Sequence, residues 1–242
     1  MRRVALVVLA LAFASVVGGA APVDAGCCTV SRDDYIPIWS PDGRTIAFRH
    51  FLGGSVSVQL VPPARGTPHE IAAGGDPTWS SDATEIAFAS ADGIRVVTLA
   101  TGQLRRITNN RTDHAPEFSP DGGAIAFRRG AGDVWFVSSD GSGARRIASA
   151  LRSKHLTGTA QRLSWSPDGT RVAFTAARDA KARSDDEVVI ATVDGSGSRT
   201  LASHRAHDRE PAWAPSGERL AFTSLRSGNA DVYVVDSSGA NS

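Results

Sequence analysis

Short apolar runs recur along this chain, and each is centred on an alanine between two larger apolar residues. The run reads Ile-Ala-Phe at 46–48, 86–88 and 125–127, Val-Ala-Phe at 172–174 and Leu-Ala-Phe at 220–222. Charged residues do not alternate with apolar ones inside these runs, as they would in a strand with one face in water. The pattern therefore predicts strands that are covered on both faces, with the small alanine fitting the narrow space between stacked sheets.

Each apolar run ends a longer unit that the chain repeats five times. The units carry an aromatic residue at their third position and end in Phe, and they occupy residues 37–48, 77–88, 116–127, 163–174 and 211–222. The aromatic residues stand at positions 39, 79, 118, 165 and 213, which gives steps of 40, 39, 47 and 48. A period of about 40 to 50 residues made of short strands is typical of a β-propeller blade. The repeat thus predicts an all-β fold, a β-propeller with five recognisable blades.

The residues around the third unit predict how one blade is built. An extended run at 115–119 leads into the turn Ser119-Pro-Asp-Gly122, and a second strand is expected at 124–128. A third strand, rich in β-branched and aromatic residues, is expected at 133–138, and a fourth at 144–148. One blade is therefore expected to contain four strands joined by three turns.

The reversal between the first two strands uses the same residues in three units. Proline presets φ, aspartate bonds the nearby backbone, and glycine supplies a positive φ. These turn residues are Pro41, Asp42, Gly43, Pro120, Asp121, Gly122, Pro167, Asp168 and Gly169. The fifth unit keeps Pro215 and Gly217, so the same turn is expected there. The second unit reads Ser80-Ser-Asp-Ala83, and its missing glycine predicts a turn that is of another type or strained.

Residues 1–25 have the pattern of a secretory signal peptide. Two arginines precede an apolar stretch from Val4 to Val17, and small residues follow up to Ala25. That stretch is too short to span a bilayer comfortably. The mature chain is expected to start near Gly26, to lie in the periplasm or outside the cell, and to form one domain over 26–242 without a transmembrane span.

Charge and cysteine usage narrow the classes of partner. The chain has 26 Lys and Arg against 25 Asp and Glu, and its arginines are scattered, which argues against nucleic acid as a partner. The two cysteines, Cys27 and Cys28, would lie at the mature N-terminus. Asp24-Ala-Gly-Cys27 matches the last three positions of a bacterial lipobox, so a lipid anchor at Cys27 is one alternative. Free thiols, a bridge to another chain, or packing as small apolar side chains are the others, and packing is favoured.

Both ends of the repeat array bear on how the ring closes. Residues 28–34 align with the run before the third unit, which is the register of a fourth, outermost strand. At the other end, a third strand at Asp231–Val235 is followed by a turn at Asp236–Gly239. The N-terminal strand is expected to complete the last blade of a closed five-bladed ring and so remove an exposed edge. The alternative is a truncated six-bladed ring, whose bare blade faces would aggregate or dimerise.

The repeated unit resembles the WD-repeat-like β-propeller of the TolB family. The resemblance covers about residues 34–239 and rests on Trp-Ser-Pro-Asp-Gly-x-x-Ile-Ala-Phe, followed by Asp-Val-Tyr-Val-Val-Asp and by Asp-Gly-Ser-Gly-x-Arg-Arg-Ile. Propellers of this family occur in the periplasmic TolB protein, where they bind a peptidoglycan-associated lipoprotein, and joined to α/β-hydrolase peptidase domains. Here the signal runs almost directly into the first unit, without the separate TolB α/β domain, and the peptidase motif Gly-x-Ser-x-Gly is absent. The resemblance therefore implies a binding propeller, with an envelope lipoprotein as one candidate partner.

Aspartates stand three residues before the repeated proline in three units, at Asp34, Asp113 and Asp208. In a propeller this connection leads from an outer strand toward the central channel, so the three carboxylates are expected on one face of the ring. They could bind a cation or the basic part of a partner. The favoured interpretation is that each accepts hydrogen bonds from backbone N–H groups of its own loop.

Further charged residues are expected on the same loop face. His114 and Arg209 follow two of the aspartates and are candidates for surface recognition. The longer steps between units mark insertions at 149–161 and 178–187, and charged loops on a rigid scaffold are typical recognition elements. His204 and His207 lack further ligands at a known spacing, so neither a metal site nor a cofactor is predicted.

These observations predict an exported, non-catalytic propeller that binds a protein or peptide partner. One alternative is a propeller hydrolase or lyase with a polar site in its channel. The acid, base and charge-stabilising groups of that alternative would be Asp113, His114, Arg162, His207 and Asp208. Another alternative is a truncated fragment, or a module of a larger assembly that depends on a partner chain for solubility.

Overall fold

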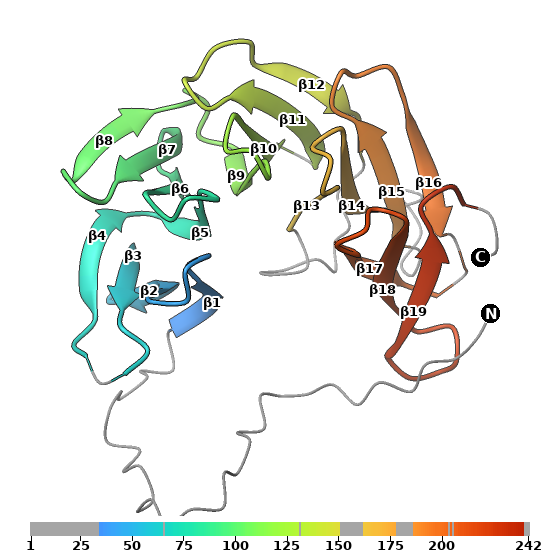
Figure 1. Ribbon diagram of the computed structural model, residues 1–242, viewed down its shortest axis with the longest axis horizontal. Coiled ribbons are helices and arrows are strands. Elements are labelled where there is room, and N and C mark those ends of the chain that lie inside the picture. Colours follow the sequence, from blue (N-terminus) through green and yellow to red (C-terminus); the bar gives the residue numbers. More distant parts are fainter. Residues whose placement is uncertain are drawn as a thin grey trace, which may run out of the picture.

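The computed structural model describes residues 34–64, 66–130, 132–150, 162–177, 186–202, 204 and 206–239. Within this part the chain is all β, and its strands form five antiparallel sheets. The sheets follow one another along an arc around a common centre, and we number them blades 1 to 5 in chain order (Figure 1). The β-propeller fold expected from the repeat is confirmed. The predicted signal peptide, Cys27, and the segment expected to close the ring lie outside the described residues.

The strands of a blade pair in chain order, so the first strand is innermost and the last is outermost (Figure 1). The first strands are β1 (Asp34–Trp39), β5 (Gly75–Trp79), β9 (Asp113–Phe118), β13 (Ser164–Trp165) and β17 (Asp208–Trp213). The second strands are β2 (Ile46–Leu52), β6 (Glu85–Ser90), β10 (Ala124–Arg129), β14 (Arg171–Ala177) and β18 (Arg219–Ser224). The third strands are β3 (Ser55–Val61), β7 (Gly93–Thr98), β11 (Asp133–Ser138), β15 (Asp186–Thr192) and β19 (Asp231–Asp236). The fourth strands are β4 (His69–Ala73), β8 (Gln103–Arg106), β12 (Arg145–Ala148) and β16 (Ser198–Ala202).

Blade 5 has three strands within the described residues, whereas the other four blades have four each. The same residues contain no helix with the length and hydropathy needed to cross a membrane.

The turn between the first and second strands is held by a serine and an aspartate. In blade 1, Ser40 Oγ donates to Asp42 Oδ1 at 2.6 Å, and the N–H of Arg44 donates to the same oxygen at 3.1 Å. These donors lower the pKa of the Asp42 carboxyl. Gly43 has a φ of 71°, and its N–H donates to the Ser40 carbonyl at 2.9 Å. The same serine-to-aspartate bond closes the turns at Ser119–Asp121 and Ser166–Asp168, at 2.5 Å each.

The second unit keeps this turn although alanine replaces the glycine. The N–H of Ala83 donates to the Ser80 carbonyl at 3.0 Å, and Ser80 Oγ donates to Asp82 at 2.7 Å. Ala83 has a φ of 61°, in the left-handed region that an L residue enters at roughly 1–2 kcal/mol. The turn is therefore of the repeated type and strained.

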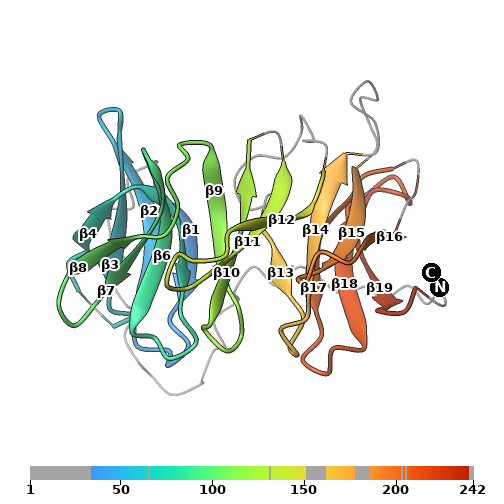
Figure 2. The same cartoon turned by 90° about the horizontal axis from the view of Figure 1, so that it is seen from above.

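The apolar runs pack between neighbouring blades and alternate in direction. In blade 2, Ile86 and Phe88 pack against blade 1, whereas Ala87 between them packs against blade 3. In blade 3, Ile125 and Phe127 likewise face blade 2 and Ala126 faces blade 4. Figure 2 shows these sheets standing side by side, as this packing requires. Each blade thus presents large side chains forward to the preceding blade and small ones backward to the next.

The aromatic residue of the unit joins each blade to the one before it. A tryptophan indole N–H donates to a backbone carbonyl of the preceding blade, and the acceptor is always the residue before that blade's own aromatic residue. The donor–acceptor pairs are Trp79–Ile38 (3.3 Å), Trp165–Glu117 (3.0 Å) and Trp213–Ser164 (3.1 Å). In blade 3 the position holds Phe118, which is buried but has no N–H to donate. The repeat therefore specifies the junction between blades as well as the blade.

Candidate functional site

The innermost strands share an irregularity at the residue before the repeated proline. The register with the second strand shifts there in blades 1, 2, 3 and 5. In each case this residue has a positive φ: Ile36 (59°), Asp76 (52°), Ala115 (48°) and Glu210 (55°). A β-bulge bends its strand and re-aims the side chain it carries. Because the same costly conformation recurs in four blades, it is a built feature of the inner wall.

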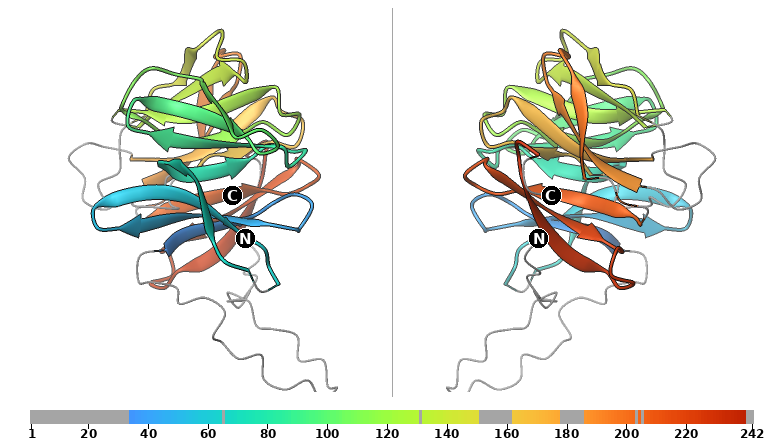
Figure 3. Two further views of the ribbon diagram at one scale, coloured as in Figure 1. Left: turned by 90° about the vertical axis from the view of Figure 1, so that its left-hand side faces the viewer. Right: turned by 90° about the vertical axis from the view of Figure 1, so that its right-hand side faces the viewer.

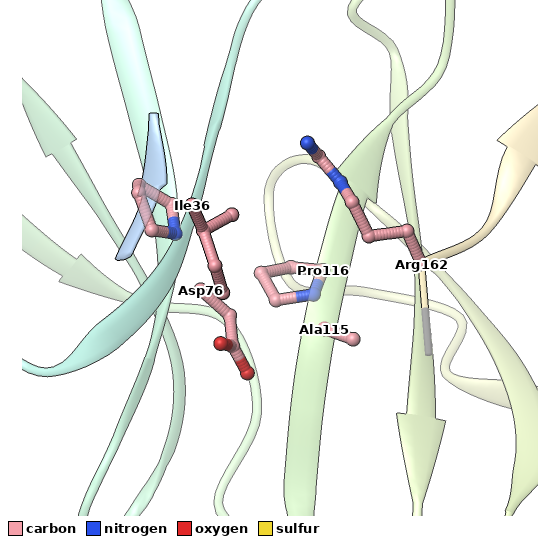
Figure 4. A pocket seen from close by; sticks show the side chains of 6 residues that line it. Ile36, Asp76, Ala115, Pro116 and Arg162 are labelled. Atoms are coloured by element: carbon pink, nitrogen blue, oxygen red, sulfur yellow. The ribbon is translucent and has the colours of Figure 1, made fainter. Parts of the chain in front are cut away.

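Several of these bulge residues meet at a small pocket on the inner wall (Figure 4). Four blades contribute its lining, which comprises Ile36, Asp76, Pro77, Ala115, Pro116 and Arg162. Arg162 stands in blade 4 at the position of the bulge residues, where Leu163 replaces the proline. The pocket has a volume of about 10 Å³, which is room for about one water molecule. It is a notch in the wall, too small to enclose a drug-sized ligand.

The bulge position is also where the chemistry of the five units differs most. It holds Ile36, Asp76, Ala115, Arg162 and Glu210, whereas the next residue is proline in four units and the third position is aromatic in all five. A residue that repeats serves the blade, as the proline and the aromatic do. A residue that does not repeat, placed by a strained backbone at the inner wall, fits a role in recognition.

Two ion pairs join neighbouring blades beside the pocket. Arg49 Nη1 lies 3.5 Å from Asp76 Oδ1, and Arg162 Nη2 lies 3.2 Å from Glu117 Oε2. Burial raises the pKa of the Glu117 carboxyl, and the Arg162 guanidinium opposes that rise. Figure 4 shows the Asp76 carboxylate and the Arg162 guanidinium pointing toward opposite ends of the pocket. The inner wall therefore presents both signs of charge within a short distance.

The aspartates expected to face the channel are buried and paired with arginines of their own blades. The Asp113 carboxylate accepts hydrogen bonds from Arg129 at 2.6 and 2.9 Å. The Asp208 carboxylate accepts from Arg226 Nη2, at 3.2 Å to each oxygen. Both guanidinium groups also lie over aromatic rings of the same blade. These bonds come from arginine side chains, whereas the sequence favoured backbone N–H donors.

Three other predicted residues form polar contacts near the same strands. His114 Nδ1 lies 3.0 Å from the carbonyl oxygen of Thr112 in its own loop. His207 Nδ1 and Arg209 Nε lie 2.8 Å and 2.6 Å from the same oxygen of Asp186, which is buried at the start of β15. The last two contacts join blade 5 to blade 4.

Asp34 begins β1, where its backbone pairs with His50 of β2. Its side chain lies outside the described part, as do most of the loops at 149–161 and 178–187. Among the residues that the structure describes, no group of three or more His, Cys, Asp or Glu is placed to hold a metal ion.

Of the residues predicted from the sequence, Arg162 alone is among those that line the pocket. The sequence argument did not select Ile36, Asp76 or Ala115, nor Glu117 as the partner of Arg162. A signal for the bulge residues was present, because each directly precedes the repeated proline and differs from its counterparts.

Comparisons with known proteins agree with the repeat. The family model described as TolB beta propeller domain matches residues 152–242. The Tol-Pal system protein TolB of Francisella tularensis subsp. holarctica is 37% identical over 84 residues, which cover 31% of this chain and 19% of that protein. The curated relatives are thus matched over about a fifth of their length.

Solved structures extend the likeness to most of the chain. TolB from Acinetobacter baumannii has a TM-score of 0.64 at 21% identity, over 86% of this chain and 53% of that chain. An oligogalacturonate lyase in complex with manganese has a TM-score of 0.60 at 19% identity, over 85% of this chain and 63% of that chain. At these identities the structures share the fold alone, whereas the sequence matches bear on the kind of repeat. The repeats of this chain are those of the TolB-like β-propeller family.

Proposed function

We propose that this chain is an exported, non-catalytic propeller that binds a protein or peptide partner at its inner wall. The observation that carries the proposal is the strained bulge position, which holds five chemically different side chains on an otherwise repeated scaffold. Recognition requires such variation, because specific contacts need different groups at fixed places. Export rests on the pattern of residues 1–25, which is that of a secretory signal.

The chemistry of the wall favours a polypeptide over a small molecule. The pocket lined by Ile36, Asp76 and Arg162 is too small to enclose a drug-sized ligand, but it can receive the end of one side chain. Carboxylates and guanidiniums alternate around it, and a polypeptide offers both charges and backbone groups as matching partners. The TolB relatives are described as proteins of the Tol-Pal system, so an envelope lipoprotein is the first partner to test.

A binding role is better supported than the catalytic alternative. That alternative needs Asp113 and Asp208 as an acid and a base in the channel. Both carboxylates are buried, and both are compensated by an arginine of the same blade. A carboxylate held in this way is poorly placed to exchange a proton with a substrate.

The proposal can be tested by titrating the chain with the soluble part of a peptidoglycan-associated lipoprotein, using calorimetry. Arg162→Ala removes a wall side chain, and Arg146→Ala is the matched control because Arg146 lies on the outermost strand β12 and is also ion-paired, at 3.4 Å to Asp133. We expect Arg162→Ala to weaken binding about tenfold or more, as for an interface arginine, and Arg146→Ala to have no effect. Equal affinities for the two variants would refute the inner wall as the site. A chain that does not bind the probe would refute the proposed partner.

A further inference from the structure

The forward face of blade 1 exposes side chains that the other blades bury. Trp39 is 54% exposed, whereas Trp79 and Trp165 are 8% and 9% exposed at the same position of their units. Ile46 is half-buried, whereas its counterpart Ile86 is completely buried against blade 1. In blades 2 to 5 this forward face packs against the preceding blade, so blade 1 carries an apolar face without a blade in front of it among the described residues.

The backward face of blade 5 is exposed in the complementary way. Val234 in β19 is 45% exposed, whereas Val96 and Ile190, at the same register of their third strands, are 0% and 3% exposed. Ala221 is half-buried, whereas its counterpart Ala173 is completely buried against the next blade. The small residues that normally receive the next blade are therefore open to solvent on blade 5.

These two faces are the two halves of one junction. Trp39 has the position of the indoles that donate to the preceding blade. Ala212 directly precedes Trp213, so its carbonyl has the position of the acceptors at Ile38, Glu117 and Ser164. Ala212 is exposed. The forward face of blade 1 thus carries the donor and large side chains of the junction, and the backward face of blade 5 carries the acceptor and small ones.

One chain does not bring its own two faces together. Blades 1 and 5 lie at opposite ends of the open arc in Figure 1, and the two views of Figure 3 show them on different sides of the molecule. Apolar sheet faces of this kind mark interaction surfaces. The partner that fits each face is a blade of the same repeat, and another copy of this chain supplies that blade in the required orientation.

We propose that copies of this chain associate head to tail, with the forward face of blade 1 of one copy packed on the backward face of blade 5 of another. The association is heterologous, because the two contacting surfaces differ. Trp39 of one copy donates its indole N–H to the Ala212 carbonyl of the next, as the other three tryptophans do within one chain. The inference does not depend on the function proposed for the inner wall.

Paired variants test this arrangement by sedimentation velocity of the full chain over a range of concentrations. Trp39→Glu places a charge on the forward face and leaves the backward face intact, and Val234→Glu does the reverse. Leu104→Glu is the matched control, since Leu104 is 47% exposed on the outermost strand β8, away from both faces. We expect the unaltered chain and the control to gain mass with concentration, and each face variant alone to sediment as one chain.

The mixture of the two face variants gives the decisive result. Each variant retains the half that the other has lost, so the mixture should form a complex of two chains that grows no further. A mixture that stays at the mass of one chain overturns the proposal, as does an unaltered chain that is monomeric at all concentrations. Circular dichroism melts check that the variants are folded. If a glutamate variant melts earlier than the unaltered chain, Trp39→Gln and Val234→Thr replace the pair, with the same outcomes.

Discussion

Replacing Trp165 by phenylalanine should loosen the junction between blades 3 and 4 without disturbing the blades themselves. The change removes the indole N–H that donates to the Glu117 carbonyl at 3.0 Å, while the remaining ring keeps its edge contact with Phe136. A lost hydrogen bond is worth about 0.5–1.5 kcal/mol. The smaller ring buries less apolar area, at about 25 cal/mol per Å², which adds about 1 kcal/mol. We expect a total loss of about 2 kcal/mol, or about 4–8 °C in Tm for a chain of this size.

The assay is urea unfolding followed by far-UV circular dichroism, because the mutation itself changes tryptophan fluorescence. Trp39→Phe is the control, since Trp39 makes no junction with a preceding blade among the described residues and is 54% exposed. It should change stability by less than about 0.5 kcal/mol, as for most surface substitutions. Phe118 shows that the repeat accepts phenylalanine at this position. Equal losses for the two variants, or no loss for Trp165→Phe, would refute the indole bond as a determinant of the junction.

Three further changes test the turn, a buried ion pair and a buried acid. Ala83→Gly should raise the free energy of unfolding by about 0.5–1 kcal/mol, because it relieves the left-handed strain but adds chain entropy. Gly169→Ala, whose new Cβ would meet nothing within 4 Å, should lower it by a similar amount in the same urea titration. Asp113→Asn should lower it by about 2–4 kcal/mol by leaving Arg129 uncompensated, and an unchanged urea midpoint would contradict that account. Because burial raises the pKa of Glu117 above its ordinary 4.5, ionisation is less favourable in the folded state, and stability should fall as pH rises from about that value; Glu117→Gln should flatten this part of a Tm-against-pH curve.

The fold was predictable because its determinants are local and repeated. The turn residues around Asp42 and Asp121 act within five residues of sequence, so the hairpin can be read from its letters. The alternation of large and small residues in Ile-Ala-Phe has a direct counterpart in the forward and backward packing of Ile86, Ala87 and Phe88. Even the second unit was predicted to be strained, and Ala83 shows that strain in its φ of 61°.

The site was harder to predict because it depends on contacts between units. Asp113 was chosen for its position before the proline, but whether its carboxylate faces the channel depends on Arg129, which the strand register places beside it. The bulge position carries no distinctive residue type, and its meaning appears only when four blades converge on one pocket. Trp39 shows the same limit, since identical letters bury one tryptophan and expose another according to whether a blade lies in front.

Glu117 ties the junction between blades to the candidate site. Its carbonyl accepts the indole N–H of Trp165, and its carboxylate pairs with Arg162 at 3.2 Å. Arrays of repeats owe their stability to nearest-neighbour interfaces, so a change at one interface acts first on the residues that span it. The Trp165→Phe variant should therefore lower partner affinity through the altered position of Arg162, although Trp165 is not among the residues that line the pocket. The same substitution at Trp39 should leave that affinity unchanged, because the junction it removes lies at the far end of the arc from Arg162.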